Sequence, residues 1–111
     1  MDGDLPESDW KIVRNLHEIA LDRFCQRVLA DIARTAANGE QKAHTRFCEI
    51  FKIVEAQDKE IEWIFSDLRR SSAMEHLCAM RTRGLLEEAE FGRLSRETRD
   101  EVQAFLADPI I

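Results

Sequence analysis

The sequence has almost no proline: Pro6 and Pro109 are the only two, and both lie near an end of its 111 residues. No proline ring therefore interrupts a helix over roughly a hundred residues between them. Glycine is scarce as well, and the pair Asn38-Gly39 is the single break in a helical pattern that begins at Trp10. These absences predict long helices and an all-α fold.

Long apolar runs are also missing. No stretch approaches the roughly eighteen apolar residues that a membrane-spanning helix needs, and the acidic start Met1-Asp2-Gly3-Asp4 has no apolar segment of a signal peptide. The three cysteines are an odd number, widely spaced along the chain. We therefore expect a cytoplasmic protein with reduced thiols and no membrane association.

The sequence has no basic excess, because its formal net charge is −6. This balance argues against non-specific binding to nucleic acid and to an anionic membrane surface, since both reward positive charge. The arginines of the last third are interspersed with acidic residues, so that most of their charge is compensated.

An apolar stripe follows the Asn38-Gly39 break. Its members recur every three or four residues, with Gln57 in the one polar slot: Ala43, Phe47, Ile50, Val54, Ile61, Ile64 and Leu68. A helix with such a stripe must pack it against another helix. The pattern predicts a long antiparallel hairpin of helices over about 10–37 and about 40–70, with Gly39 in the left-handed conformation that ends the first. A fold at 38–39 would place Phe24 near Ile53.

The apolar side of the first helix changes direction along its length, so its two halves should touch different neighbours. Three short helices are expected after the hairpin, at about 73–83, 86–92 and 96–107. Ser72 and Glu75 have the spacing of a capping box, and Ser95 has the place of an N-cap. We expect a flexible acidic tail over 1–9, with Ser8 or Asp9 as the first N-cap, and one helical, bundle-like domain over 10–111.

Constellations for catalysis or metal binding are missing. The histidines His17, His44 and His76 form neither Glu-x-x-His nor His-x-x-x-His, and no Cys-x-x-Cys occurs. The cysteines lie on or beside apolar stripes, unlike exposed catalytic thiols. We therefore predict no enzyme activity, no metal, no cofactor and no catalytic residue.

One segment suggests an alternative function. Residues 89–102, Ala-Glu-Phe-Gly-Arg-Leu-Ser-Arg-Glu-Thr-Arg-Asp-Glu-Val, resemble the helix-turn-helix of lactose-repressor-type regulators. The resemblance implies a DNA-binding element at about 87–107, with Ser95, Arg96 and Arg99 contacting DNA. Against it, Arg93 occupies the turn position, and Asp100 and Glu101 would face phosphates. The segment is otherwise a packing element, and we expect no nucleic-acid partner.

Apolar surface on more than one side of both long helices exceeds what one hairpin can cover. A two-fold dimer that forms a four-helix bundle would cover the excess. We therefore expect a small, non-catalytic, homodimeric binding or adaptor protein. The candidate interface residues are Phe51 and Trp63 on the second helix and Ile12 and Ile19 on the first.

Overall fold

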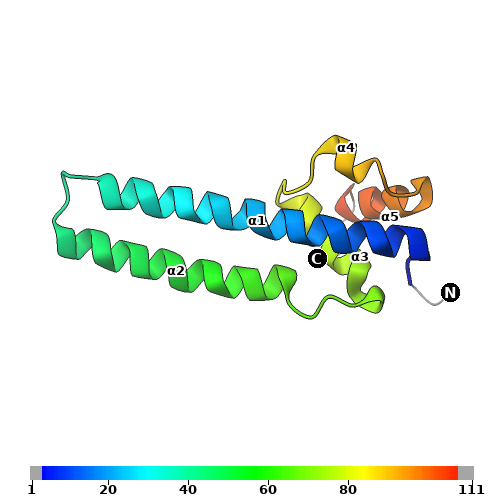
Figure 1. Cartoon of the computed structure of the whole chain (residues 1–111), viewed down its shortest axis with the longest axis horizontal. Coiled ribbons are helices and arrows are strands. Elements are labelled where there is room, and N and C mark those ends of the chain that lie inside the picture. Colours follow the sequence, from blue (N-terminus) through cyan, green and yellow to red (C-terminus); the bar gives the residue numbers. More distant parts are fainter. Residues whose placement is uncertain (1–3, 108–111) are drawn as a thin grey trace. The chain divides into compact units, whose positions relative to one another are not determined.

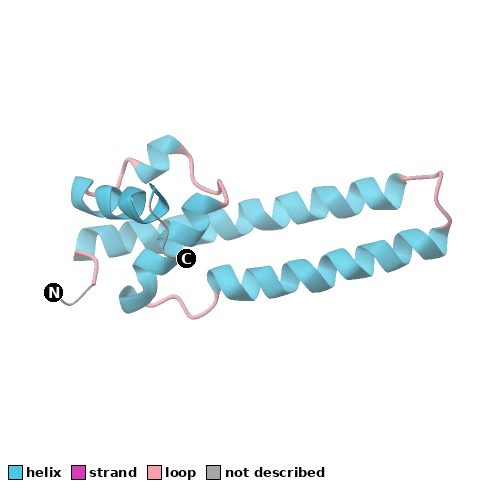
Figure 2. Ribbon diagram, turned by 180° about the vertical axis from the view of Figure 1, so that it is seen from behind, coloured by secondary structure: helices cyan, strands magenta, loops and turns pink. Residues whose placement is uncertain are grey.

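The computed structural model describes residues 4–107, which contain helices and no strand (Figures 1 and 2). The elements in chain order are α1 (Glu7–Ala37), α2 (Ala43–Phe65), the short 3-10 helix η1 (Arg70–Ser72), α3 (Ala73–Thr82), α4 (Glu88–Phe91) and α5 (Arg96–Ala107). The predicted all-α class, the long hairpin and the three short C-terminal helices are confirmed. Within the described part of the chain, no helix has the length and apolar character needed to cross a membrane.

The contacts of the chain divide it into two compact units. We call residues 21–66 the hairpin unit, and the described residues of 1–20 and 67–111 the core unit. Helix α1 contributes to both, since its residues up to Ala20 belong to the core unit and those from Leu21 to the hairpin unit. The prediction that the two halves of this helix touch different neighbours is confirmed.

In the hairpin unit, α1 and α2 run antiparallel, as both ribbon views show (Figures 1 and 2). The turn between them is longer than predicted, because α2 begins at Ala43 rather than at about 40. The prediction of a left-handed Gly39 is wrong: the one described glycine with positive φ is Gly84. Instead, the Asn38 side-chain oxygen accepts a hydrogen bond from the Glu40 N–H at 3.3 Å, which closes the turn locally.

Helix α2 ends at Phe65, several residues before the predicted end at about 70. Ser66 is extended, and Asp67 has a left-handed φ of 59°, which no continuing helix permits. Aspartate tolerates this conformation better than most residues because its short side chain can bond locally. No glycine or proline marks the break, so the sequence pattern did not indicate it.

The register of the hairpin also differs from the prediction. Phe24 packs edge-on against Phe65, with ring centroids 5.9 Å apart, and this partner lies well beyond the predicted Ile53. Cys25 and Cys48 are both free and half-buried.

The core unit begins before the predicted start of the first helix. Helix α1 starts at Glu7, and the Pro6 carbonyl accepts from the Trp10 N–H at 2.9 Å, so Ser8 and Asp9 lie inside the helix and the predicted N-caps are wrong. Leu5 is buried, and its carbonyl accepts from Arg70 Nε at 2.9 Å. Leu5 and Asp9 are therefore buried and residues from Glu7 onward are helical, which corrects the predicted flexible tail for these positions; residues 1–3 lie outside the described residues.

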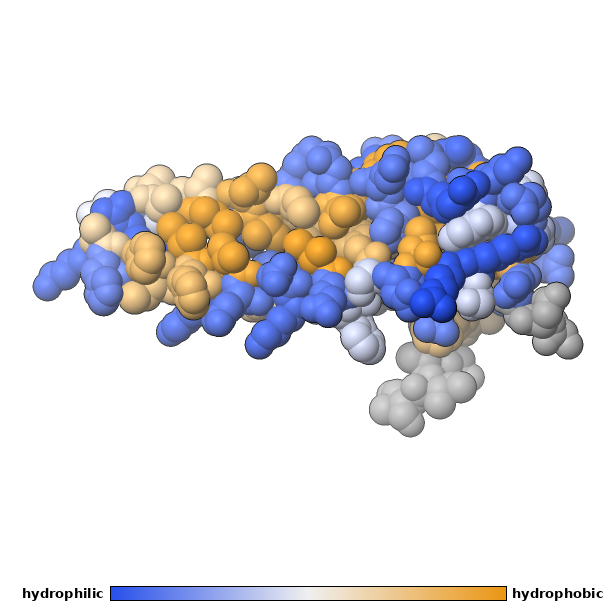
Figure 3. Space-filling model, turned by 60° about the horizontal axis from the view of Figure 1, so that its bottom comes forward, coloured by the Kyte–Doolittle hydropathy of each residue, from blue (hydrophilic) through white to orange (hydrophobic). Residues whose placement is uncertain are grey.

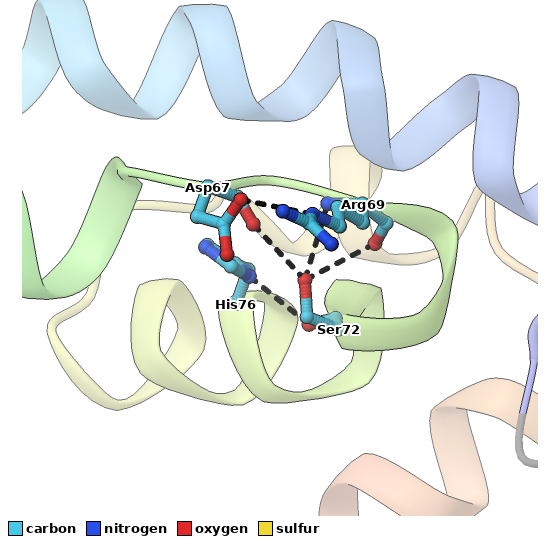
Figure 4. A network of polar contacts seen from close by, with 4 residues as sticks. All are labelled: Asp67, Arg69, Ser72 and His76. Carbon is cyan, nitrogen blue, oxygen red and sulfur yellow. Dashed lines mark hydrogen bonds and ion pairs between the residues drawn. The ribbon is translucent and has the colours of Figure 1, made fainter.

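A polar turn leads into α3 (Figure 4). Ser72 Oγ accepts from the Arg69 N–H at 3.1 Å, and Arg69 Nε donates to Asp67 Oδ1 at 2.9 Å. His76 Nδ1 donates to the Ser72 carbonyl at 3.0 Å. The predicted capping box of Ser72 with Glu75 is wrong, because the Ser72 hydroxyl serves this turn and makes no cap bond to α3.

Helix α3 ends where it was predicted to end, before Gly84, whose φ of 65° is the left-handed conformation that glycine adopts at low cost. Helix α3 packs against α5, and the buried apolar side chains of this unit come from α1, α3, α4, α5 and the loops beside them. They include Val13, Leu16, Leu77, Met80, Leu85, Phe91 and Val102.

Candidate interaction surface

The hairpin unit has little buried interior. Among the buried residues of the described chain, only Ile64 and Phe65 belong to it. The seam between its helices is formed by half-buried side chains, including Val28 of α1 and Ile50 and Ile53 of α2. A pair of helices therefore covers only part of its apolar surface.

The seam is polar near the turn. Arg46 Nη1 donates to the Ala36 carbonyl at 2.5 Å, and Gln41 Nε2 donates to Glu49 Oε1 at 3.4 Å. Within the described residues, the buried atoms Arg46 Nε and Gln41 Oε1 have no hydrogen-bond partner. Polar groups thus occupy places that a helix pair usually fills with apolar side chains.

Large apolar side chains lie exposed just beside this seam. The exposed fractions are 63% for Leu29, 67% for Phe47, 57% for Phe51 and 49% for Val54. We call these four residues the hairpin face. Isolated exposed apolar residues are ordinary, but four large ones on one short hairpin form a patch of the kind that marks interaction sites.

The four residues lie on one side of the hairpin for a geometric reason. Each comes one residue after a seam position, so each is rotated from the seam by about 100° in the same sense. In an antiparallel pair, the same sense of rotation leads to the same face from both helices. Figure 3 shows apolar side chains gathered along one side of this unit.

The predicted interface residues Phe51 and Trp63 do not lie on the same side of α2. Twelve residues of helix separate them by about 120° around the axis. Trp63 is 78% exposed and lines a shallow depression with Ala56, Lys59 and Glu60. Ile12 and Ile19, the other predicted interface residues, are half-buried members of the core unit. The four candidates therefore belong to two units, and the two on α2 lie on different sides of that helix.

Two residues of the DNA-binding alternative, Ser95 and Arg99, are hydrogen-bonded within the core unit, whereas Arg96 is exposed. The Ser95 N–H donates to Asp9 Oδ1 at 2.9 Å and its hydroxyl to Asp9 Oδ2 at 2.6 Å. The same hydroxyl accepts from the Thr98 N–H at 3.3 Å, so Ser95 is the predicted N-cap of α5. Arg99 Nε donates to the Leu94 carbonyl at 3.1 Å, and Arg96 lies 3.7 Å from Asp100.

Asp9 is the centre of this polar cluster, and it is 1% exposed. Burial by itself would raise the pKa of its carboxyl group, but hydrogen bonds from Ser95 and Thr98 outweigh burial, so the pKa lies below its ordinary value of 3.8. The Thr98 hydroxyl donates to Asp9 Oδ2 at 2.7 Å. The charged carboxylate therefore stabilises the joint between α1 and the start of α5. Nothing in the sequence pattern indicated this role for Asp9.

The cysteine and histidine side chains lie in buried and in exposed environments. Cys78 is buried, and burial together with Glu101 and Glu75 raises the pKa of its thiol to about 11, which makes it a poor nucleophile. His17 and His76 contact each other edge-on, with ring centroids 5.9 Å apart.

The second environment is exposed. His44 Nε2 lies 3.6 Å from Cys48 Sγ, one helical turn away on α2. Their spacing of four residues, His-x-x-x-Cys, was present in the sequence and was overlooked. Within residues 4–107, no three His, Cys, Asp or Glu side chains gather as a complete set of metal ligands.

A scan against protein-family models, a search of curated proteins and a search of solved structures each find no match to this chain.

Proposed function

We propose that the protein is a non-catalytic homodimeric binding or adaptor protein, and that the hairpin face is its dimer surface. The observation that supports this most directly is the exposure of Leu29, Phe47, Phe51 and Val54 beside a seam that is partly polar. Leaving such side chains in water forgoes roughly 1.5–3 kcal/mol for each one that a partner would fully bury. A protein surface is therefore the expected partner of this face.

The charges of α2 favour a second copy of the chain as that partner. Nearest the turn the exposed charges are basic, Lys42 and Lys52, whereas Arg46 and Glu49 are held in the seam. The other half is acidic, with Glu55, Asp58, Glu60 and Glu62 against Lys59. Two copies of α2 that run antiparallel across a two-fold axis would oppose basic to acidic halves at both ends.

Two paired hairpins make a four-helix bundle, in which each apolar face is covered by the other. The interface would have an apolar centre formed by the hairpin face and a charged rim from α2, which is the usual arrangement of a stable interface. We propose a cytoplasmic location for the dimer, which the free state of Cys25, Cys48 and Cys78 supports.

Sedimentation equilibrium of the metal-free protein tests this proposal. We expect a dimer at micromolar concentration, and we expect Phe51→Asp to convert it to a monomer, because a carboxylate would be buried without a partner. Trp63→Asp is the matched control: it places the same charge about 120° around the same helix, away from the hairpin face, and should leave the dimer intact. A wild-type mass near 12.9 kDa at every concentration would overturn the proposal.

A further inference from the structure

The exposed pair His44 and Cys48 has the geometry of a metal chelate. The distance between His44 Nε2 and Cys48 Sγ is 3.6 Å. In tetrahedral zinc sites, Zn–S is about 2.3 Å and Zn–N about 2.0–2.1 Å, so the nitrogen and sulfur of two ligands lie about 3.6 Å apart. The two donor atoms are thus already separated by one edge of a zinc coordination tetrahedron.

The helix holds this spacing without loop movement. His44 and Cys48 are four residues apart on α2, so their side chains project from the same side of a regular helix. His44 is exposed and Cys48 is half-buried, which leaves the remaining coordination positions open. Thiolate and imidazole together are the ligand types that favour Zn²⁺ over Mg²⁺ or Ca²⁺.

We propose that His44 and Cys48 bind a zinc-type divalent ion, and that a carboxylate from a second copy of the chain completes the site. This completion rests on the proposed antiparallel pairing. His44 lies about 20° around the helix from Phe51 of the hairpin face, at the margin of the interface. Asp58 and Glu62 lie along the same flank of α2, in its acidic half. Antiparallel pairing sets this acidic flank of one copy opposite the His44–Cys48 pair of the other.

Such a dimer would hold two equivalent ions, one for each chain. On binding, the Cys48 thiol releases its proton to solvent, and the thiolate and the neutral His44 ring each donate an electron pair to the ion. The apolar depression beside the pair, lined by Phe47, Cys48, Phe51 and Lys52, would shield the thiolate on one side. Metal binding would then strengthen a dimer that forms weakly without metal.

Cobalt(II) titration of the metal-free, reduced full chain tests the site, since Co²⁺ replaces Zn²⁺ in tetrahedral sites and is visible spectroscopically. We expect one ion for each chain, with thiolate-to-cobalt charge transfer and the visible bands of tetrahedral cobalt, reversed by added Zn²⁺. Cys48→Ser and His44→Gln should each abolish the thiolate-bound spectrum. Cys25→Ser and His17→Gln, which change the same residue types elsewhere, should leave it unchanged. Absence of the spectrum in the wild type, or its persistence in Cys48→Ser, would overturn the site.

Substitution of the acidic flank, Asp58 and Glu62, tests the metal site and the dimer pairing separately. The double variant Asp58→Asn with Glu62→Gln should weaken cobalt binding and reduce the increase in dimer fraction that metal causes. The control Glu18→Gln should change neither quantity. If a monomer binds cobalt and the double variant does not change this binding, two proposals are overturned together: the carboxylate ligand from a second copy, and the dimer. A metal-free dimer that gives no cobalt spectrum would overturn the metal site and support the dimer.

Discussion

The two units of this protein are held together in different ways. The core unit surrounds fully buried side chains such as Leu16, Leu77 and Met80, and a buried carboxylate, Asp9, joins the start of α1 to the start of α5. The hairpin unit buries only Ile64 and Phe65 among its described residues and leaves other large apolar side chains exposed, including Phe47, Phe51 and Trp63. Two helical units of the same chain thus differ: one has an interior of its own, and the other leaves much of its apolar surface exposed.

The difference shows that a pair of helices needs further helices packed against it to bury its apolar side chains. A helix pair can bury one stripe on each helix, whereas short helices packed across a helix enclose its side chains from several directions. In the core unit α3 and α5 pack together to provide that enclosure. In the hairpin unit the seam near the turn is polar, and Phe47 and Val54 of the apolar stripe lie exposed beside it.

The largest expected effect is the loss of a buried side chain in the core unit. Leu77→Ala removes a side chain that is 0% exposed, and it should lower the free energy of unfolding by about 2–5 kcal/mol at every protein concentration. Val54→Ala, on the half-exposed hairpin face, should cost under about 0.5 kcal/mol in a dilute monomer and more when the protein dimerises. Urea unfolding at two protein concentrations measures both. Equal, concentration-independent losses for the two variants would contradict the contrast between the units.

The next effect concerns the polar joint of the core unit. Because the folded-state pKa of Asp9 is below its ordinary value of 3.8, the carboxylate stabilises the fold fully above that pH. The stabilisation should be lost as the pH falls through the lowered folded-state pKa. Asp9→Asn should reduce the free energy of unfolding by about 1–3 kcal/mol at neutral pH and make it less sensitive to acid.

Thermal unfolding from neutral to acidic pH measures the Asp9 effect. Glu97→Gln removes an exposed carboxylate from the first turn of the same α5 and should leave the acid dependence nearly unchanged. If Asp9→Asn keeps the acid dependence of the wild type, the proposed role of the carboxylate in the joint is wrong.

The smallest effect is expected at Trp63. Its ring is 78% exposed, on a side of α2 away from the hairpin face, so Trp63→Ala should change the free energy of unfolding by less than about 0.5 kcal/mol. Denaturant unfolding at constant protein concentration gives this value. A loss of several kcal/mol would show that Trp63 lies in an interface, and it would restore the grouping of Trp63 with Phe51 that the sequence predicted.

Much of the local structure followed from the sequence because it depends on local chemistry. The end of α3 was predictable from Gly84, and the start of α5 from Ser95, because a left-handed glycine and an N-cap serine act on neighbouring backbone groups. The end of α2 was missed because Asp67 adopts the left-handed conformation without a glycine to indicate it. The first N-cap was missed because the Asp9 carboxylate is used by Ser95, far along the chain.

The candidate surface was predictable only in part. The sequence indicated an excess of apolar side chains, and it named Phe51, but it could not say which apolar residues would face α1. Which residues face α1 depends on how α2 is rotated about its own axis. In the structure this rotation places Arg46, beside Gln41, in the seam and leaves Phe47 outside it. The pairing of His44 with Cys48 was within reach of the sequence, since four-residue spacing on a helix is sufficient to bring two side chains together.

The sequence by itself determined the helical class, the order of the helices and most ends of the three short helices, because periodicity, glycine and capping residues act within a few positions of the chain. Only the tertiary structure decided the division into two units, the burial of Asp9 against Ser95, and the exposure of Phe47, Phe51 and Val54. These features depend on contacts between distant segments. A repeating apolar pattern specifies that a helix must pack, but the neighbour and the rotation toward it are set by the packing of the other segments.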